Sequence, residues 1–255
     1  MKTNLLKQLL ISGQPARGCW LGLPSPFSAR LLAHLPLDWL VVDAEHAPID
    51  AKTLSLMVAA ILEANGPAPL VRIAQSTAQN IKQALDTGAY GIIAPMINTA
   101  EEAAQVVAWS RFPPQGVRSF GSFYAGLGFG QSMGEYLQAA NQQIIVGIQI
   151  ESEAAIANLD EIFNVKGIDL VFVGPIDLSI SLGVEPFTAN PSPALQRALN
   201  LITSAARPHR LPLGIYCTDG KAAEERIRQG YQFVNVTSDT GGLLRHVQAE
   251  LDASK

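Results

Sequence analysis

Two acidic residues, Glu151 and Asp177, each follow an apolar run that is typical of a buried parallel strand, 144-IIVGIQI and 170-LVFVG. The carboxyl ends of parallel strands meet at one face of a sheet or barrel, so the two carboxylates should lie together. Hard divalent cations take oxygen ligands and keep positions open for water and substrate. The pair therefore predicts a metal site that binds a cation and a chelating substrate together. The alternative interpretations are a helix N-terminal acid for Glu151 and a turn residue for Asp177.

Several other side chains that could take part in catalysis or binding lie at the ends of apolar runs of the same kind. Catalytic residues of a parallel barrel come from the carboxyl ends of several different strands, so this clustering favours an enzyme. Besides the two acids, the set comprises Trp20, Asp43, Glu45, His46, Arg72 and Gln149.

Arg72 and His46 suggest specific roles within this set. A guanidinium binds the carboxylate of a 2-oxo acid through two parallel hydrogen bonds, which favours Arg72 as the substrate anchor. Its alternative is a buried ion pair with Asp43 or Glu45. His46 follows a predicted strand and stands beside both acids, and an imidazole titrates near neutral pH. These features favour His46 as a general base, with Asp43 in the same catalytic group, over a histidine of purely structural role.

The elements that position these residues alternate along the whole chain. Apolar runs predict eight strands, at 18-GCWLGL, 39-WLVVDA, 69-PLVRIA, 91-GIIAPM, 144-IIVGIQI, 170-LVFVG, 212-PLGIYC and 233-FVNVTS. Capped amphipathic segments predict helices at 51–65, 77–88, 99–111 and 219–230. Such alternation gives an α/β protein with right-handed crossovers, either an open sheet or a closed barrel. Eight repeats in 255 residues favour a single (β/α)8 TIM barrel over residues 1–255.

Residues 112–143 break the pattern, because they combine many glycines, aromatic residues and two adjacent prolines. A long irregular connection inside a compact domain usually has a function. We expect this segment to cover the mouth of the active site.

Composition excludes several classes of protein. A net charge of -4 gives no attraction to nucleic acid or to an anionic membrane surface, and no apolar stretch is long enough for a membrane span or a signal peptide. Cys19 and Cys217 lie far apart without a CxxC partner and are expected to be small buried hydrophobes. We expect a cytoplasmic enzyme that acts on small molecules.

Six stretches of the sequence carry a family resemblance: WLVVDAEHAP, PLVRI, IKQALDTGAYGIIAPMINTAEEA, PPQGVRS, IQIES and VGPIDLS. With these motifs the chain resembles the HpcH/HpaI family of class II, metal-dependent pyruvate aldolases. The likeness covers nearly the whole chain. It implies a barrel that cleaves a 4-hydroxy-2-oxo acid reversibly into pyruvate and an aldehyde.

The resemblance also implies particular roles. Glu151 and Asp177 would hold Mg²⁺, Mn²⁺ or Co²⁺. Arg72 would bind the pyruvate carboxylate, and Gln149 would bind the substrate or its water. Asp86 of a neighbouring subunit would pair with His46 in a homo-oligomer, a hexamer by family likeness.

The remaining wall of the pocket would come from Trp20 and from the backbone at Pro175 and Ile176. The alternative for Trp20 is a residue of the barrel core without a role in the site. The alternative for Asp86 is a residue that simply ends a helix before Gly88.

Three functions remain in competition. The aldolase is favoured, and no lysine at a predicted strand end supports a Schiff-base route. A metal-enolate condensing enzyme or decarboxylase of the same superfamily, similar to citrate synthase, would consume oxaloacetate or an acyl-CoA. A non-catalytic binding protein on the same barrel is disfavoured, because such a protein would be expected to have lost Arg72, His46, Glu151 and Asp177. The stretch SFGSFYAGLGFG lacks the basic side chain that some relatives carry, which disfavours a dicarboxylic substrate unless Arg118 serves.

Overall fold

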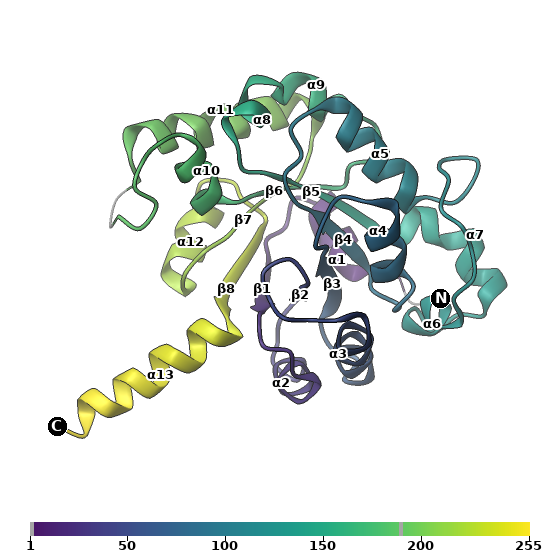
Figure 1. Cartoon of the computed structure of the whole chain (residues 1–255), viewed down its shortest axis with the longest axis horizontal. Coiled ribbons are helices and arrows are strands. Elements are labelled where there is room, and N and C mark those ends of the chain that lie inside the picture. Colours follow the sequence, from purple (N-terminus) through teal and green to yellow (C-terminus); the bar gives the residue numbers. More distant parts are fainter. Residues whose placement is uncertain (1–2, 189–190) are drawn as a thin grey trace.

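The computed structural model describes residues 3–188 and 191–255, which form one closed barrel of eight parallel strands in the order β1 to β8 (Figure 1). This confirms the predicted (β/α)8 barrel and all eight predicted strands. The strands are β1 (Ala16–Leu21), β2 (Trp39–Asp43), β3 (Ala68–Arg72), β4 (Gly91–Ala94), β5 (Ile145–Ile150), β6 (Leu170–Val173), β7 (Leu213–Ile215) and β8 (Phe233–Ser238).

Helices follow the strands and surround them, while one short helix precedes β1. Their bounds are α1 (Leu5–Ile11), α2 (Pro26–Leu32), α3 (Ala51–Glu63), α4 (Ala78–Leu85), α5 (Ala100–Ser110), α6 (Phe123–Gly128), α7 (Met133–Gln143), α8 (Glu153–Ala157), α9 (Leu159–Phe163), α10 (Pro175–Ser181), α11 (Pro193–His209), α12 (Gly220–Arg228) and α13 (Asp239–Ala253).

The four helices expected from sequence are α3, α4, α5 and α12. Each begins after a side chain that accepts a hydrogen bond from a backbone N–H of the first turn, which satisfies one of the free donors there. These capping side chains belong to Asp50, Thr77, Thr99 and Asp219. The predicted ends therefore agree with the observed ones to within a turn.

Alternation along each strand decides which residues enter the barrel, because successive side chains point to opposite faces. In β2, Trp39 and Val41 belong to the cluster inside the barrel, whereas Leu40 and Val42 belong to the larger cluster beneath the helices. Asp43 is the next residue of the inward series. The same rule directs the strand-end residues of β1, β3 and β5, including Trp20 and Arg72, toward the barrel axis.

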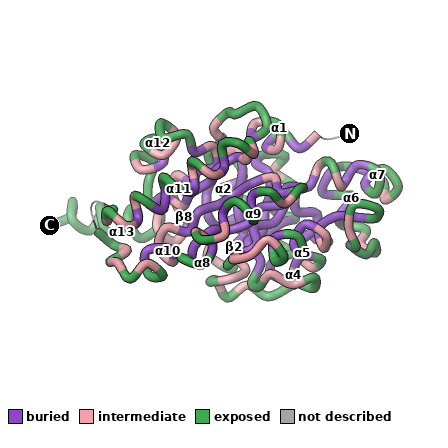
Figure 2. Tube along the Cα trace, turned by 90° about the horizontal axis from the view of Figure 1, so that it is seen from above, coloured by how far each residue is buried: buried purple, intermediate pink, exposed green. Residues whose placement is uncertain are grey.

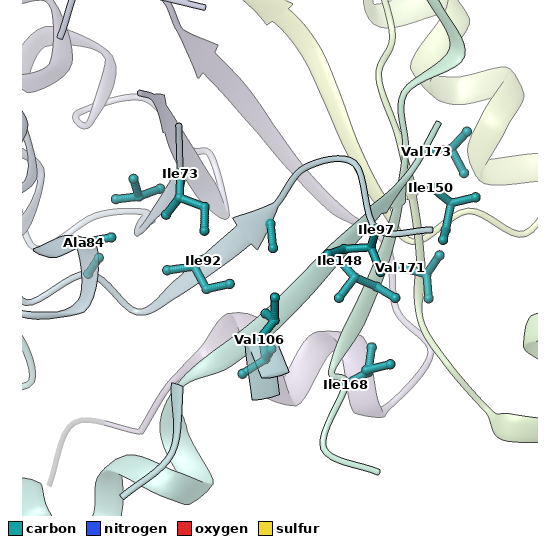
Figure 3. Packing of buried hydrophobic residues seen from close by; sticks show 14 of the residues in the cluster. Ile73, Ala84, Ile92, Ile97, Val106, Ile148, Ile150, Ile168, Val171 and Val173 are labelled. Atoms are coloured by element: carbon teal, nitrogen blue, oxygen red, sulfur yellow. The ribbon is translucent and has the colours of Figure 1, made fainter. Parts of the chain in front are cut away.

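Two apolar layers hold the barrel. The interior layer contains large aromatic rings such as Trp39, which stacks on Phe233 with 3.9 Å between ring centroids. A Cβ on Gly18 would overlap the Trp39 ring, so only glycine leaves that ring room to lie across the interior. The outer layer packs β-branched strand residues against the helices, as Figure 3 shows for Ile148, Val171 and their neighbours. Figure 2 shows the buried trace concentrated in the middle of the molecule.

The segment 112–143 is not one irregular loop, so that expectation needs correction. It contains α6 and α7, and α7 starts with a capping box in which Ser132 and Glu135 satisfy each other's backbone N–H groups. The glycines of α6 and the paired prolines obscured this helical signal. Arg118 of this segment is buried.

The last helix, α13, extends away from the barrel in Figure 1 instead of lying along it. Asp239 is its one buried residue. Apolar side chains on it are exposed, namely Leu243, Leu244, Val247 and Leu251. A helix with this much unburied apolar surface lacks the packing that normally stabilises an amphipathic helix.

Two further findings bear on the composition arguments. Across 3–188 and 191–255, no helix combines the length and apolarity needed to cross a membrane. Cys19 and Cys217 are buried and form no disulfide, as expected, and burial raises the pKa of each thiol to about 12.

Candidate active site

A cavity of about 440 Å³ opens at the carboxyl ends of the strands. Its wall includes eight residues singled out from the sequence: Trp20, Asp43, His46, Arg72, Gln149, Pro175, Ile176 and Asp177. Three residues singled out from the sequence, Glu45, Asp86 and Glu151, are not among the residues that line it. The strand-end rule thus places most of the predicted side chains around one space.

Arg72 lies at the centre of an ion-pair cluster. Its Nε and Nη2 donate to the two carboxylate oxygens of Asp43 at 2.9 and 2.5 Å, and its Nη1 lies 3.2 Å from Oε2 of Glu45. The guanidinium also lies over the Trp20 ring, 5.1 Å from the centroid. The alternative of a buried ion pair is therefore present in the structure, while Arg72 also lines the cavity.

The pKa values in this cluster reflect burial and charge together. Burial alone would raise the pKa of Asp43, but the hydrogen bonds and charge of Arg72 hold it below its usual value. Burial raises the pKa of Glu45, and the charges of Glu151 and Asp43 add to this effect, although Arg72 and His46 oppose it. The cluster contains more carboxylates than cations.

Glu151 is buried at the edge of the cavity, where it is 3 % exposed. Its Oε1 accepts a hydrogen bond from the backbone N–H of Met96 at 2.8 Å, and its Oε2 accepts one from the side-chain amide of Gln149. Burial raises the pKa of Glu151, and the negative charge of Asp177 raises it further. The two predicted ligands are therefore close enough to repel each other.

Gly174 allows Glu151 and Gln149 to come close to β6. A Cβ at this position would overlap Oε2 of Glu151 and would lie 3.0 Å from Nε2 of Gln149. Only a residue without a side chain fits here, since the backbone and the carboxylate share the space.

Asp177 projects from the first turn of α10, the helix that Gly174 and Pro175 begin. Pro175 at the first position has no N–H to leave unsatisfied, which is why the chain turns into a helix there. Across the described residues, no hydrogen bond or ion pair involves the Asp177 carboxylate. It is thus an acid in the first turn of a helix rather than the turn residue named as its alternative, and it also lines the cavity.

His46 stands on a tight turn after β2. Oδ1 of Asp43 accepts hydrogen bonds from the backbone N–H groups of Glu45 and His46, at 3.1 and 3.3 Å, which fixes the turn. The imidazole is 64 % exposed, and its Nε2 lies 3.8 Å from Oε2 of Glu45. His46 therefore faces the open side of the cavity, where a substrate or a second subunit could reach it.

Asp86 lies elsewhere on the molecule. It ends α4, and its Oδ1 accepts a hydrogen bond from Nη2 of Arg118 at 3.0 Å. Arg118 also donates to the hydroxyl of Tyr136 at 2.9 Å and lies 4.6 Å over the Phe112 ring. Arg118 therefore holds the 112–143 segment together and does not line the cavity, and no residue of that segment lines it either.

Sequence reasoning missed several residues of the cavity and its edge. Met96 adopts a left-handed backbone conformation, with φ of 54°, that aims its N–H at Glu151. The others lie at the carboxyl ends of β1, β7 and β8 or just beyond them and comprise Gly22, Tyr216, Ser238 and Thr240. The runs PLGIYC and FVNVTS were recognised as strands; they contain Tyr216 and Ser238, and Thr240 lies two residues beyond the second run.

The metal hypothesis fits the donors present. No group of three or more His, Cys, Asp and Glu side chains that could hold a metal occurs within 3–188 and 191–255. Two carboxylates with open positions are nevertheless a usual arrangement for Mg²⁺, which keeps waters and substrate oxygens. The Oε1 of Gln149 is buried without a hydrogen-bond partner among the described residues. An acceptor oxygen left free beside two mutually repelling acids suits a cation or its water.

A closed barrel with carboxylates, a guanidinium and an imidazole around one cavity at its carboxyl end defines a barrel enzyme. The model of one family, described as HpcH/HpaI aldolase/citrate lyase, matches residues 17–246. The chain belongs to this family, and its predicted assignment as a carbon–carbon lyase is supported.

Among curated proteins, the hydroxypyruvate/pyruvate aldolase of Deinococcus radiodurans is 39% identical, covering 95% of this chain and 87% of that protein. The 5-keto-4-deoxy-D-glucarate aldolase of Klebsiella pneumoniae is 38% identical, covering 99% and 97%.

Among solved structures, an HpcH/HpaI aldolase/citrate lyase family protein from Burkholderia cenocepacia has a TM-score of 0.90 at 34% identity, covering 99% of both chains. The citrate synthase SbnG has a TM-score of 0.86 at 28% identity, covering 100% of this chain and 98% of that one.

Proposed function

We propose that the protein is a metal-dependent pyruvate aldolase that cleaves a 4-hydroxy-2-oxo acid into pyruvate and an aldehyde, and catalyses the reverse addition. The observation that carries this proposal is the cavity that holds Arg72, His46 and Asp177 together, with Glu151 at its edge. Family membership and the aldolases among the curated relatives support it.

Glu151 and Asp177 would hold the divalent cation, Mg²⁺, Mn²⁺ or Co²⁺. When bound, such a cation stabilises the negative charge that develops on the enolate of a 2-oxo acid. The chain's own contribution is to keep both carboxylates close despite their repulsion. The Met96 N–H and the Gln149 amide do this for Glu151.

Arg72 would orient the substrate carboxylate. A guanidinium has five N–H donors, and the Asp43 carboxylate accepts hydrogen bonds from two of them, while Glu45 lies at ion-pair distance from Nη1. The three that remain are on Nη1 and Nη2, so they can bind a carboxylate as a fork. Asp43 and Glu45 thus hold Arg72 in position rather than competing with substrate.

His46 would transfer the proton. In cleavage it removes the proton of the C4 hydroxyl, the C3–C4 bond breaks, and its electron pair passes to the enolate of pyruvate. The C4 oxygen becomes the aldehyde carbonyl, and a proton added at C3 completes pyruvate. Addition follows the same steps in reverse.

Other residues of the wall would confine the substrate. Gln149 would bind the substrate or its water, while Trp20 and the backbone of Pro175 and Ile176 close the pocket. Because no lysine is among the described residues that line the cavity, a Schiff-base mechanism has no candidate there.

The assembly we propose is a homo-oligomer, a hexamer by family resemblance, in which Asp86 of a neighbour pairs with His46. Two features support this. His46 is exposed on the open side of the cavity, and Asp86 lines a separate cavity of its own chain. The apolar face of α13, with Leu244 and Val247 exposed, needs a partner to be buried. Two buried cysteines without a disulfide fit a reducing compartment such as the cytoplasm.

The deciding experiment follows exchange of the pyruvate methyl protons in deuterated buffer, because exchange needs the enolate but no aldehyde. We expect exchange with Mg²⁺, Mn²⁺ or Co²⁺, loss of exchange with a chelator, and recovery on adding metal back. Exchange that persists after full metal removal would contradict the proposal. Glu151→Gln should weaken Mn²⁺ binding measured by calorimetry, whereas Glu153→Gln, an acid two residues further on, serves as the matched control.

The condensing-enzyme alternative is less favoured, since the citrate synthase is less similar in sequence than the aldolases. Consumption of oxaloacetate with an acyl-CoA, in place of pyruvate with an aldehyde, would identify that alternative.

Mixing inactive His46→Ala and Asp86→Ala subunits tests the site proposed to be shared between subunits. Recovery of activity in the mixture is expected, and no recovery would reject the pairing.

A further inference from the structure

The cavity has two chemically different sides. The residues with charge come from strands β2 to β6 and comprise Asp43, His46, Arg72 and Asp177. The ends of β7, β8 and β1 supply the other side, which comprises Tyr216, Ser238, Thr240, Gly22 and Trp20. In a closed barrel β7, β8 and β1 are consecutive, so these five residues form one continuous wall. We name this set the hydroxyl wall.

A bulge in β8 brings Ser238 into this wall. Along β1 and β8, Gly18 pairs with Asn235 but Cys19 pairs with Thr237, so Val236 is an extra residue. Without the bulge, Ser238 would point out of the barrel, as Val234 does, because the two residues are separated by an even number of positions. With it, Ser238 pairs with Trp20, which points into the barrel. Bulges next to active sites commonly redirect a side chain in this way.

The hydroxyls of the wall have donors to spare. Ser238 Oγ accepts the N–H of Gly241, and Ser238 and Thr240 share one hydrogen bond between their hydroxyls at 3.2 Å. Two hydroxyl protons and one shared bond leave one proton free for a ligand. The Tyr216 hydroxyl has no hydrogen bond to any described residue, and its ring contacts Trp20 edge to face with centroids 6.0 Å apart.

The loop that carries Gly22 is fixed rather than mobile. Asp239 accepts the N–H groups of Gly22 and Leu23 at 2.8 and 3.0 Å and that of Thr240 at 2.7 Å. Its carboxylate is thus occupied by three backbone donors and holds the β1 and β8 ends together. The wall is therefore pre-organised, which favours specific recognition over adaptation.

The hydroxyl wall has no lysine or arginine of its own among the described residues that line the cavity. Arg72 is the one lysine or arginine among the described residues that line the cavity, and it is engaged by Asp43 and Glu45. Arg245 lies beyond the wall, where it bonds the hydroxyl of Thr237 and the carbonyl of Thr218. A carboxylate placed against Tyr216 and Ser238 would therefore find hydroxyl donors but no free guanidinium or ammonium group to pair with on the described part of the wall.

We infer that the hydroxyl wall is the subsite for the aldehyde half of the substrate and selects a short, neutral, hydroxylated aldehyde over a carboxylated or purely apolar one. This inference rests on the proposed function, because that function puts pyruvate at Arg72 and the acids and leaves the opposite wall for the aldehyde. The free hydroxyl protons and lone pairs of Tyr216 and the Ser238–Thr240 pair bind the hydroxyl next to the carbonyl.

The test uses three two- or three-carbon acceptors with pyruvate: glycolaldehyde, propanal and glyoxylate. Glycolaldehyde and propanal differ by a hydroxyl in place of a methyl, whereas glyoxylate carries a carboxylate. We expect wild type to have its highest kcat/KM with glycolaldehyde. A wild type that prefers propanal or glyoxylate overturns the inference.

Variants assign the preference to the wall. Tyr216→Phe and Thr240→Val should each lower the glycolaldehyde-to-propanal ratio of kcat/KM about fivefold to tenfold, the effect of losing one hydrogen bond. Thr240→Ser keeps the hydroxyl and should keep the ratio. Tyr231→Phe is the matched control, since Tyr231 precedes β8 at the other end of the barrel. Ratios in both Tyr216→Phe and Thr240→Val within twofold of wild type would overturn the inference.

The two proposals fail in different ways. Absence of metal-dependent pyruvate methyl exchange in wild type, without any aldehyde, rejects the aldolase itself. Exchange in wild type combined with an unchanged acceptor ratio in the variants rejects the hydroxyl wall alone. A ratio of kcat/KM values for one variant cancels general damage to the enzyme, so only a change in acceptor recognition moves it.

Discussion

Replacing Asp43 by asparagine should destabilise the barrel measurably, because Asp43 neutralises a buried guanidinium. The change keeps the size of the side chain and removes its charge. Asp43 accepts two hydrogen bonds from Arg72, and the side chains are 8% and 11% exposed. Removing one partner of a buried ion pair costs about 3–5 kcal/mol. Glu45 still faces Arg72 at 3.2 Å, so we expect the lower end, about 3 kcal/mol.

The assay is the melting temperature by calorimetry. For a chain of this size 1 kcal/mol corresponds to about 2–4 °C, so Asp43→Asn should melt about 6–12 °C below wild type at pH 7. The matched control is Asp252→Asn, which removes an exposed partner of Lys255 and should cost less than about 1 kcal/mol.

The pH dependence has a definite sign. The pKa of Asp43 is lowered in the folded protein: burial opposes this, and the hydrogen bonds and charge of Arg72 outweigh it. Its stabilisation is therefore complete above the unfolded pKa of about 4 and is lost as the pH falls through the lowered folded pKa. The gap between wild type and Asp43→Asn should shrink below about pH 4. A gap at pH 7 no larger than that of the control, or one that widens on acidification, would refute the reasoning.

Three further predictions concern the site and the core. Gly174→Ala should weaken Mn²⁺ binding at least tenfold by calorimetry, because the new Cβ displaces Glu151. The control Gly134→Ala, with open space around its Cβ, should bind Mn²⁺ as wild type does. Equal affinities of the two variants would contradict the contact between Gly174 and Glu151. Arg72→Lys should raise the KM for pyruvate about tenfold or more in steady-state assays, since an ammonium lacks the planar fork, and an unchanged KM would exclude Arg72 as the anchor. Cys19 and Cys217 should resist alkylation in native protein at pH 8, because burial raises each thiol pKa to about 12. Both should react rapidly in urea. Fast labelling of the native protein, measured by mass spectrometry, would count against their burial.

Much of the site could be predicted because the barrel has a simple geometry. Apolar runs located the strands, and the polar residues at the carboxyl end of each run had to lie at the carboxyl end of the barrel. Asp43, Arg72 and Gln149 were identified in this way, and all three line the cavity. Hydrophobic periodicity needs only local sequence, which is why it was reliable here.

Contacts between distant segments were harder to predict. The sequence left open whether Arg72 pairs with Asp43 or binds substrate, and the structure has the ion pair with donors to spare. The helix α7 inside the 112–143 segment was missed, because glycines and prolines nearby hid its capping box. The pairing of Asp86 with a neighbour stays a prediction.

The sequence by itself determined the closed α/β barrel, the end of the barrel that carries the chemistry and the family, since all three depend on residue types at regular spacing. Only the tertiary structure decided how the groups meet. The left-handed Met96 N–H reaches Glu151, the missing Cβ of Gly174 lets Glu151 approach β6, and the bulge in β8 turns Ser238 inward. Each depends on backbone conformation set by packing between segments far apart in the chain, and no local pattern of side chains encodes it.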